Sequence, residues 1–145
     1  MKKKEPLTYR VLRRKNIQEV VGIFHQDSLK YATGDYPEAP WISTLMDIGY
    51  VRGLFDGRKL MAALASEGVS VSGVYLWIIA VDTDHLNQGY GQILYDHFEA
   101  EMTKKGKEWI FLTANPRPET FYLRNGFATN GFVAKEFLKL LAPNR

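Results

Sequence analysis

The sequence predicts an α/β (α+β) fold in which a mixed β-sheet carries helices on both faces. Two β-like stretches, residues 50–55 and 59–65, flank Asp56-Gly57, a dipeptide typical of a tight hairpin turn. Residues 75–81 are apolar at every position, which is typical of a central strand covered on both faces. A helix and another strand follow, so antiparallel hairpins are joined to a strand–helix–strand crossover in one mixed sheet.

The N-terminal third is expected to hold one strand and two helices. Residues 9–12 form the first expected strand. Asn16 offers a side-chain oxygen suited to a helix cap, and apolar residues recur at three- and four-residue spacing over 17–24, which predicts a helix with one buried stripe. Glycine and proline within residues 31–40 break that helix, and a short second helix is expected over 41–46.

Five further elements are expected after the hairpin of residues 50–55 and 59–65. In order they are a strand over 69–81, a helix from about Gly89 to Gly106, a strand over 109–113, a helix over about 117–125 and a strand over 132–141. Lys104 and Lys105 suit the C-terminus of the long helix electrostatically. Gly126 can take the left-handed conformation that ends the shorter helix. The last segment also fits helical spacing.

Length and composition indicate one domain over residues 1–145, with a flexible end over residues 1–6. The chain has 46% hydrophobic and 24% charged residues, which is an ordinary globular balance. It contains no cysteine, which excludes disulfides, cysteine-ligated zinc, iron–sulfur clusters and a thiol nucleophile. We expect no metal site.

The charge pattern argues against several partner classes. A formal net charge of +3 suits a small anionic ligand and does not require a nucleic acid. Lys2, Lys3 and Lys4 could open a secretory signal, but no apolar stretch follows them. Because the longest uninterrupted apolar run, residues 74–81, has only strand length, we expect no membrane span, no membrane partner and a cytoplasmic location.

The segment from Val81 to Leu94 carries the strongest functional signal. A buried strand ends at Val81, a polar loop follows, and Gly89-Tyr90-Gly91 leads into an amphipathic helix. Glycines at such a junction let main-chain N–H groups converge on an anion, and the helix dipole favours negative charge there. The segment is therefore a candidate pyrophosphate cradle, although a Gly-x-Gly pair alone also serves as a simple tight turn.

Two other nucleotide-binding motifs are absent. Gly106-Lys107 lacks both the preceding glycine and the following Ser or Thr of a phosphate loop. A dinucleotide-binding fingerprint needs a third glycine at position 94, which is Leu94. It also needs a parallel start, which the hairpins contradict.

The cradle segment resembles motif A of the GCN5-related N-acetyltransferase (GNAT) superfamily, Gln/Arg-x-x-Gly-x-Gly/Ala. The matching residues are Leu86-Asn87-Gln88-Gly89-Tyr90-Gly91. Both glycines match, and Leu86 replaces the Gln or Arg of the first position. That replacement removes one side chain and leaves the main-chain donors in place.

A second resemblance lies downstream, in the family's motif B, roughly Asn-x-x-Ala-x-x-x-Tyr-x-x-x-Gly-Phe. The residues in register are Asn115, Tyr122, Gly126 and Phe127. Pro118 replaces the Ala of the motif. The two motifs occur in the family's order, and the resemblance covers about residues 8–141. It implies a twisted, mostly antiparallel GNAT sheet of six to seven strands.

The resemblance implies an N-acetyltransferase that uses acetyl-coenzyme A. In the family, the pyrophosphate sits on the motif A amides and the pantetheine arm runs along the fourth strand, where the flanking strands splay apart. The implied cofactor-binding residues are Ile79, Ala80, Val81, Leu86, Asn87, Gln88, Gly89, Tyr90, Gly91, Gln92, Asn115 and Tyr122. Asn115 is expected either to bind the pantetheine or to cap the helix that follows.

Two residues are implied in catalysis, Tyr122 and Ile79. Tyr122 is expected to protonate the departing thiolate, because a phenol with a pKa of about 10 has comparable basicity; the alternative is a packed core aromatic. The Ile79 N–H is expected to act as the oxyanion donor. The general base stays open, because Tyr75 stands where histone-acetylating members place a Glu. The other candidates are Glu67, Asp82, Asp84, His85 and a water chain.

The acceptor is expected to bind near residues 31–46, the region that covers the acceptor in relatives. The predicted substrate-binding residues are Tyr31, Tyr36, Trp41 and Tyr75, with Asp35 or Glu38 attracting an ammonium group. A loop pinned by aromatic residues is the alternative. The expected partner is a small-molecule or peptide amine, and the sequence leaves a homodimer open.

A non-catalytic acetyl-coenzyme A sensor or interaction module on the same fold is the alternative function. The missing carboxylate on the fourth strand and the replacement at Leu86 motivate it. Nucleic-acid binding rests only on the net charge and the lysine-rich start, and we expect no such partner.

Overall fold

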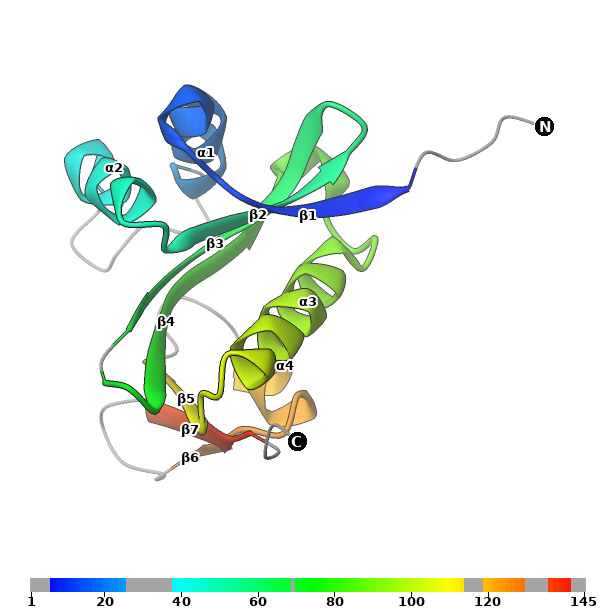
Figure 1. Cartoon of the computed structure of the whole chain (residues 1–145). Coiled ribbons are helices and arrows are strands. Elements are labelled where there is room, and N and C mark those ends of the chain that lie inside the picture. The colour runs from blue at the N-terminus through cyan, green and yellow to red at the C-terminus, as the bar shows by residue number, and fades with distance from the viewer. Residues whose placement is uncertain (1–5, 26–37, 69, 114–118, 130–135, 142–145) are drawn as a thin grey trace.

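The computed structural model forms one seven-stranded sheet within the residues that it describes, which are 6–25, 38–68, 70–113, 119–129 and 136–141. The strands are β1 (Leu7–Val11), β2 (Val51–Asp56), β3 (Lys59–Gly68), β4 (Gly73–Val81), β5 (Trp109–Thr113), β6 (Ala128–Thr129) and β7 (Glu136–Leu140). The helices are α1 (Ile17–Phe24), α2 (Ala39–Asp47), α3 (Tyr90–Lys104) and α4 (Glu119–Arg124). The strand order is β1-β2-β3-β4-β5-β7-β6 (Figure 1).

The first four strands form an antiparallel meander, and the chain then crosses over through α3 to β5, which is parallel to β4. The Asp56-Gly57 hairpin is confirmed, since β2 and β3 pair on either side of it and Gly57 has a φ of +61°. β7 returns antiparallel to β5, and β6 pairs with its other edge. The expected mixed, mostly antiparallel sheet is confirmed.

One β-bulge interrupts the ladder between β3 and β4. Ala65 pairs with Ile78, whereas the next residue, Ser66, pairs with Leu76. Trp77 is therefore an extra residue on β4. A bulge bends its strand and re-aims the neighbouring side chains, so it changes the direction of β4 in the middle of its length.

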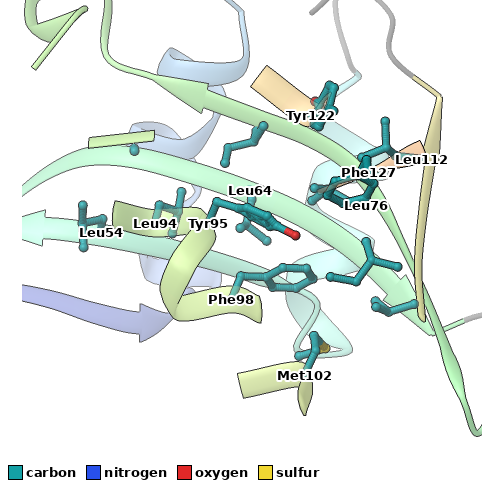
Figure 2. Close-up of a cluster of buried hydrophobic side chains, with 14 residues drawn as sticks. Leu54, Leu64, Leu76, Leu94, Tyr95, Phe98, Met102, Leu112, Tyr122 and Phe127 are labelled. Atoms are coloured by element: carbon teal, nitrogen blue, oxygen red, sulfur yellow. The ribbon is translucent and has the colours of Figure 1, made fainter. Parts of the chain in front are cut away.

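Helices cover both faces of the sheet, as predicted (Figure 1). α1 and α2 pack on one face in a buried cluster that includes Phe24 and Ile42. α3 packs on the other face, where its amphipathic character is confirmed, because Leu94, Phe98 and Met102 are buried against the strands (Figure 2). Burying both faces explains why residues 75–81 are apolar almost throughout.

A partly buried ion pair fastens α3 to the N-terminal strands. Both side-chain nitrogens Nε and Nη2 of Arg52 on β2 donate to the carboxylate of Glu101 on α3, at 2.8 and 2.9 Å. The Tyr9 hydroxyl on β1 and the Lys105 ammonium also donate to Glu101. Two-point Arg–carboxylate pairs fix orientation as well as distance, so this cluster sets how α3 crosses the sheet.

Several element boundaries differ from the sequence predictions. β1 begins at Leu7 rather than residue 9, and β3 extends to Gly68. β4 begins at Gly73 rather than residue 69, because Gly68 pairs with Val74 and the intervening residues must make the turn. The short strand β6 was not predicted, since two residues give no periodicity to read.

The predicted role of Asn16 is wrong in detail. It stands at the N-cap of α1, but its side-chain oxygen accepts from the Arg13 N–H at 3.3 Å and caps no N–H of that helix. The long helix ends as predicted, with Gly106 at a φ of +81°. Of the segment 1–6 that was predicted to be flexible, residues 1–5 lie outside the described residues, as do residues 31–37 and 117–118.

Candidate functional site

β4 and β5 are paired only at their first residues. The three parallel pairs are Gly73 with Trp109, Val74 with Ile110 and Tyr75 with Phe111. Beyond them β4 continues to Val81 with β3 as its one strand partner among the described residues. The expected splay between the two strands is therefore present, and it begins just after Tyr75.

The hydrogen-bonding pattern fixes which main-chain groups of β4 face this opening. The Asp82 N–H donates to the Met61 carbonyl on the β3 side at 2.8 Å. Main-chain groups in an antiparallel ladder alternate in direction, so Ala80 also faces β3 and the groups of Ile79 and Val81 point away from it. The structure brings Ile79 and Val81, but not the main chain of Ala80, to the open side of β4.

The loop after β4 leads directly into the start of α3. A short 3₁₀ turn, η3 (Thr83–His85), is followed by left-handed conformations at Asn87, with a φ of +62°, and at Gly89, with a φ of +84°. Gly89 is the N-cap of α3, and no side chain of the described residues caps the helix there. Glycine adopts such a conformation without strain and asparagine tolerates it better than most residues do, which explains both residues at these positions.

The first N–H groups of α3 point out of the helix without a main-chain acceptor. The first helical hydrogen bond runs from the Ile93 N–H to the Gly89 carbonyl at 3.1 Å. None of the described residues accepts from the N–H groups of residues 89–92. These donors, together with the positive end of the helix dipole, create an anion-binding position.

The helix start lies against the end of β4. A Cβ added at Gly91 would come within 3.3 Å of Val81 Cγ2, so the helix can approach this closely because residue 91 has no side chain. The side chains of residues 86–89 are exposed, and those of 90–92 are partly buried. The predicted cofactor residues from Leu86 to Gln92 therefore form one surface segment beside the open edge of β4.

The side chain of Gln92 hydrogen-bonds to side chains of α3 and of the residue after α4. Its amide exchanges two hydrogen bonds with the Asn125 amide, at 2.6 and 3.1 Å, and also donates to Asp96 at 2.8 Å. Asn125 in turn donates to the Phe121 carbonyl at 2.8 Å. This network ties α3 to the end of α4, the helix that carries Tyr122.

Tyr122 is buried, with 4% of its surface exposed. Its ring meets the rings of Phe121 and Phe127 edge to face, at centroid distances of 5.4 and 5.7 Å. Figure 2 shows Tyr122 beside Phe127 and Leu112, at the end of the cluster away from Met102. Tyr122 is therefore a packed aromatic residue in the buried cluster on the α3 face of the sheet. The other motif B residue, Asn115, lies outside the described residues.

Asp82, one of the candidate bases, is held by several donors. Its carboxylate accepts from the Asp84 N–H at 3.4 Å and lies 3.2 Å from His85 Nδ1 and 3.4 Å from Lys59 Nζ. Burial by itself raises the pKa of Asp82, but these hydrogen bonds outweigh it and lower the pKa. A carboxylate stabilised in its charged form is a weak base, which argues against Asp82 in that role.

Two predicted acceptor residues, Trp41 and Tyr75, are linked through Trp77. The Trp77 ring lies edge to face against Trp41 at 5.6 Å and against Tyr75 at 4.5 Å. Its indole Nε1–H donates to Glu67 Oε2 at 3.0 Å. The other two predicted residues, Tyr31 and Tyr36, lie outside the described residues.

Sequence reasoning missed Trp77 as a site residue. Its place in the apolar run 75–81 predicts burial, yet the residue is 42% exposed. The bulge that places it there depends on pairing with β3, which the local sequence does not reveal. The one available signal was a large aromatic carrying a polar N–H within an otherwise aliphatic run.

The described ranges contain neither a metal-binding cluster nor a membrane-spanning helix. No group of three or more histidine, aspartate and glutamate side chains there is arranged to hold a metal ion. None of the described helices, of which the 15-residue α3 is the longest, has the length and apolar character of a membrane span.

Comparisons with known proteins agree with the fold. Residues 47–129 match a family model described as an acetyltransferase (GNAT) domain. The search of curated proteins gave no match. Among solved structures, Ard1 from Thermoplasma volcanium is similar with 20% identity and a TM-score of 0.79, over 94% of this chain and 98% of that one.

Two further solved structures were determined with ligands. The PaiA N-acetyltransferase from Thermoplasma acidophilum, in complex with coenzyme A, shares 15% identity and a TM-score of 0.76, over 94% of this chain and 98% of that one. A GNAT family acetyltransferase from Brucella melitensis, in complex with acetyl-CoA, shares 14% identity and a TM-score of 0.76, over 97% and 92% of the two chains. At these identities the similarity concerns the fold.

Proposed function

Because the chain belongs to the GNAT acetyltransferase family, whose domain model matches residues 47–129, we propose that it moves an acetyl group from acetyl-coenzyme A to a primary amine. The observation that carries the proposal is the continuity of two main-chain surfaces. The open side of β4 at Ile79 leads, through the loop after Val81, to N–H groups at the start of α3 that have no acceptor among the described residues.

The described residues fit the two polar parts of this cofactor. The N–H groups of residues 89–92 would hold the diphosphate, since they are unpaired donors at the positive end of a 15-residue helix. The main-chain groups of Ile79 would hold the amide-containing arm, because an extended chain pairs with a strand edge as an added strand does. Gly91 keeps the two surfaces in contact.

The chemistry supplied by the bound cofactor is an acetyl group activated as a thioester. For this chain we assign the Ile79 N–H as a donor to the carbonyl oxygen, which stabilises negative charge that develops during acyl transfer. We assign Tyr122 as the acid that delivers a proton to the departing sulfur. Burial of Tyr122 keeps its hydroxyl in a defined position, and the aromatic contacts to Phe121 and Phe127 hold the ring.

The test is a thiol-release assay with acetyl-coenzyme A over a panel of primary amines, together with calorimetric measurement of coenzyme A binding. Acetyl transfer to at least one amine, with a product of the corresponding mass, is expected. Tight binding of the cofactor with no turnover on any amine would instead favour the non-catalytic sensor. Failure to bind the cofactor would reject both functions.

A further inference from the structure

An apolar depression opens on the sheet face that carries α1 and α2. Its volume is about 470 Å³, and its lining is Tyr75, Trp109, Phe111, Leu138 and Leu140. These side chains come from β4, β5 and β7 and lie opposite Val74, Ile110 and Leu112, which face α3. The volume lies within the range of small-molecule sites.

The depression adjoins the opening between β4 and β5. Tyr75 and Phe111 form the last parallel pair before the strands part, and both residues line the depression. Their rings contact each other at 5.3 Å. A molecule seated in the depression is therefore next to the point where the main chain of β4 turns toward Ile79.

One carboxylate stands at the rim of this apolar surface. Glu67 on β3 is paired with Tyr75 across the ladder, and its Oε2 accepts from the Trp77 indole at 3.0 Å. None of the described residues donates to its other oxygen or forms an ion pair with it. The aromatic faces of Tyr75 and Trp77 meet beside it at 4.5 Å. A carboxylate with an available oxygen beside aromatic rings is suited to an organic cation.

We propose that the acceptor is a primary amine joined by a short linker to an aromatic or branched aliphatic group. The apolar group fills the depression, and the ammonium group meets the Glu67 carboxylate, which accepts one of its protons so that the neutral amine can attack the thioester. This inference rests on the proposed acetyl transfer and names its substrate class. Among the described residues, no charged side chain lines the depression, which disfavours polyamines and amino sugars, whose polar bodies would lose hydration against these apolar side chains.

Intrinsic fluorescence reports on this site without requiring turnover. The chain has three tryptophans; Trp109 lines the depression, Trp77 donates to Glu67, and Trp41 contacts Trp77. We would titrate the protein, with and without coenzyme A, with 2-phenylethylamine, with ethanolamine and with 2-phenylethanol. The first should bind at least about tenfold more tightly than either of the others, because each of those lacks one of the two recognised groups.

Matched variants separate the two parts of the site. Glu67→Gln keeps an oxygen for the Trp77 indole and removes the charge, so it should weaken 2-phenylethylamine binding about tenfold and leave 2-phenylethanol binding unchanged. Leu138→Ser should weaken the binding of both 2-phenylethylamine and 2-phenylethanol about fivefold. Leu123→Ser, at a leucine of similar exposure on α4, should change neither.

Two outcomes would overturn the proposal. One is equal affinity for ethanolamine and 2-phenylethylamine. The other is a Leu138→Ser variant with unchanged affinities that dissociates a wild-type dimer in sedimentation velocity, which would make this face a contact between two copies. Calorimetry with coenzyme A distinguishes failure of this inference from failure of the proposed acetyl transfer. If the amines bind as expected but coenzyme A does not bind, acetyl transfer is rejected and the amine site is retained.

Discussion

Ile79 on β4 lies opposite Leu64 on β3, and this pair exchanges no main-chain hydrogen bond. The Ser66 N–H donates to the Tyr50 carbonyl on the β2 side at 2.9 Å, so by alternation Leu64 also faces β2. On β4, the hydrogen bond from the Asp82 N–H to the Met61 carbonyl implies by the same alternation that the main-chain groups of Ile79 point away from β3. Two independent bonds therefore fix the direction in which the Ile79 N–H points.

The Gly89 conformation is expected to matter for cofactor affinity. A side chain at a φ of +84° introduces strain of about 1 kcal/mol, which the Gly89→Ala variant can relieve by rotating the N–H groups at the start of α3. We expect coenzyme A to bind about tenfold more weakly, as measured by calorimetry.

Gly106 supplies the matched control at the other end of α3. Its φ is +81°, and a Cβ there meets nothing within 4 Å, as at Gly89. Gly106→Ala should therefore lose similar stability while keeping wild-type affinity for coenzyme A. Equal loss of affinity in both variants would mean that general destabilisation, and not the helix start, is responsible.

Tyr122→Phe is expected to lower kcat by about 100-fold with the coenzyme A dissociation constant nearly unchanged, because a proton donor acts in the chemical step. The ring contacts to Phe121 and Phe127 are retained by phenylalanine. Steady-state kinetics on the best amine and calorimetry on the same preparation measure the two quantities.

Tyr95→Phe is the comparison for this variant. Tyr95 is another buried tyrosine, and its hydroxyl donates to Glu99 at 2.8 Å. Loss of this hydroxyl should lower the free energy of unfolding by about 1 kcal/mol and leave kcat within about twofold of the wild-type value. A Tyr122→Phe variant with wild-type kcat would reassign Tyr122 to core packing alone.

Stability is expected to fall with acid through Glu101. Burial by itself raises the pKa of Glu101, but hydrogen bonds from Arg52, Lys105 and Tyr9 outweigh it and lower the pKa to about 2 from an ordinary 4.5. Because the folded value is the lower one, the stabilisation is complete above about pH 4.5 and is lost as the pH falls toward 2. Urea unfolding at a series of pH values measures this loss.

Glu101→Gln should reduce the free energy of unfolding by about 3 kcal/mol at neutral pH, since it leaves Arg52 buried without its charged partner. The difference in the free energy of unfolding between the variant and the wild type should become smaller as the pH is lowered. Glu108→Gln, at an exposed glutamate with no ion pair to a described residue, should follow the wild-type curve. If this difference in the free energy of unfolding stayed constant across the whole pH range, Glu101 would not be responsible for the loss of stability in acid.

Local signals in the sequence were enough for most of the fold. Asp56-Gly57 needs only its own turn chemistry to predict a hairpin, and Gly89 and Gly106 mark the two ends of α3 in the same way. The cradle was expected from Gly89, Gly91 and the helix start, whereas the splay of β4 and β5 was expected only through the family resemblance. Both are now described from main-chain pairing.

The parts that were missed depend on contacts between distant strands. The bulge at Trp77 arises from a register shift between β3 and β4, and the Glu67–Trp77 bond follows from it. The depression needs side chains from β4, β5 and β7 together. No spacing rule within one segment contains that information.

A titration of ¹⁵N-labelled protein with coenzyme A, followed by amide resonances, tests directly whether β4 and the start of α3 hold the cofactor. The largest shifts are expected at the N–H groups of Ile79 and of residues 89–92, together with slower hydrogen exchange at those amides. Saturable binding with its shifts confined to other elements, and these amides unchanged, would contradict it.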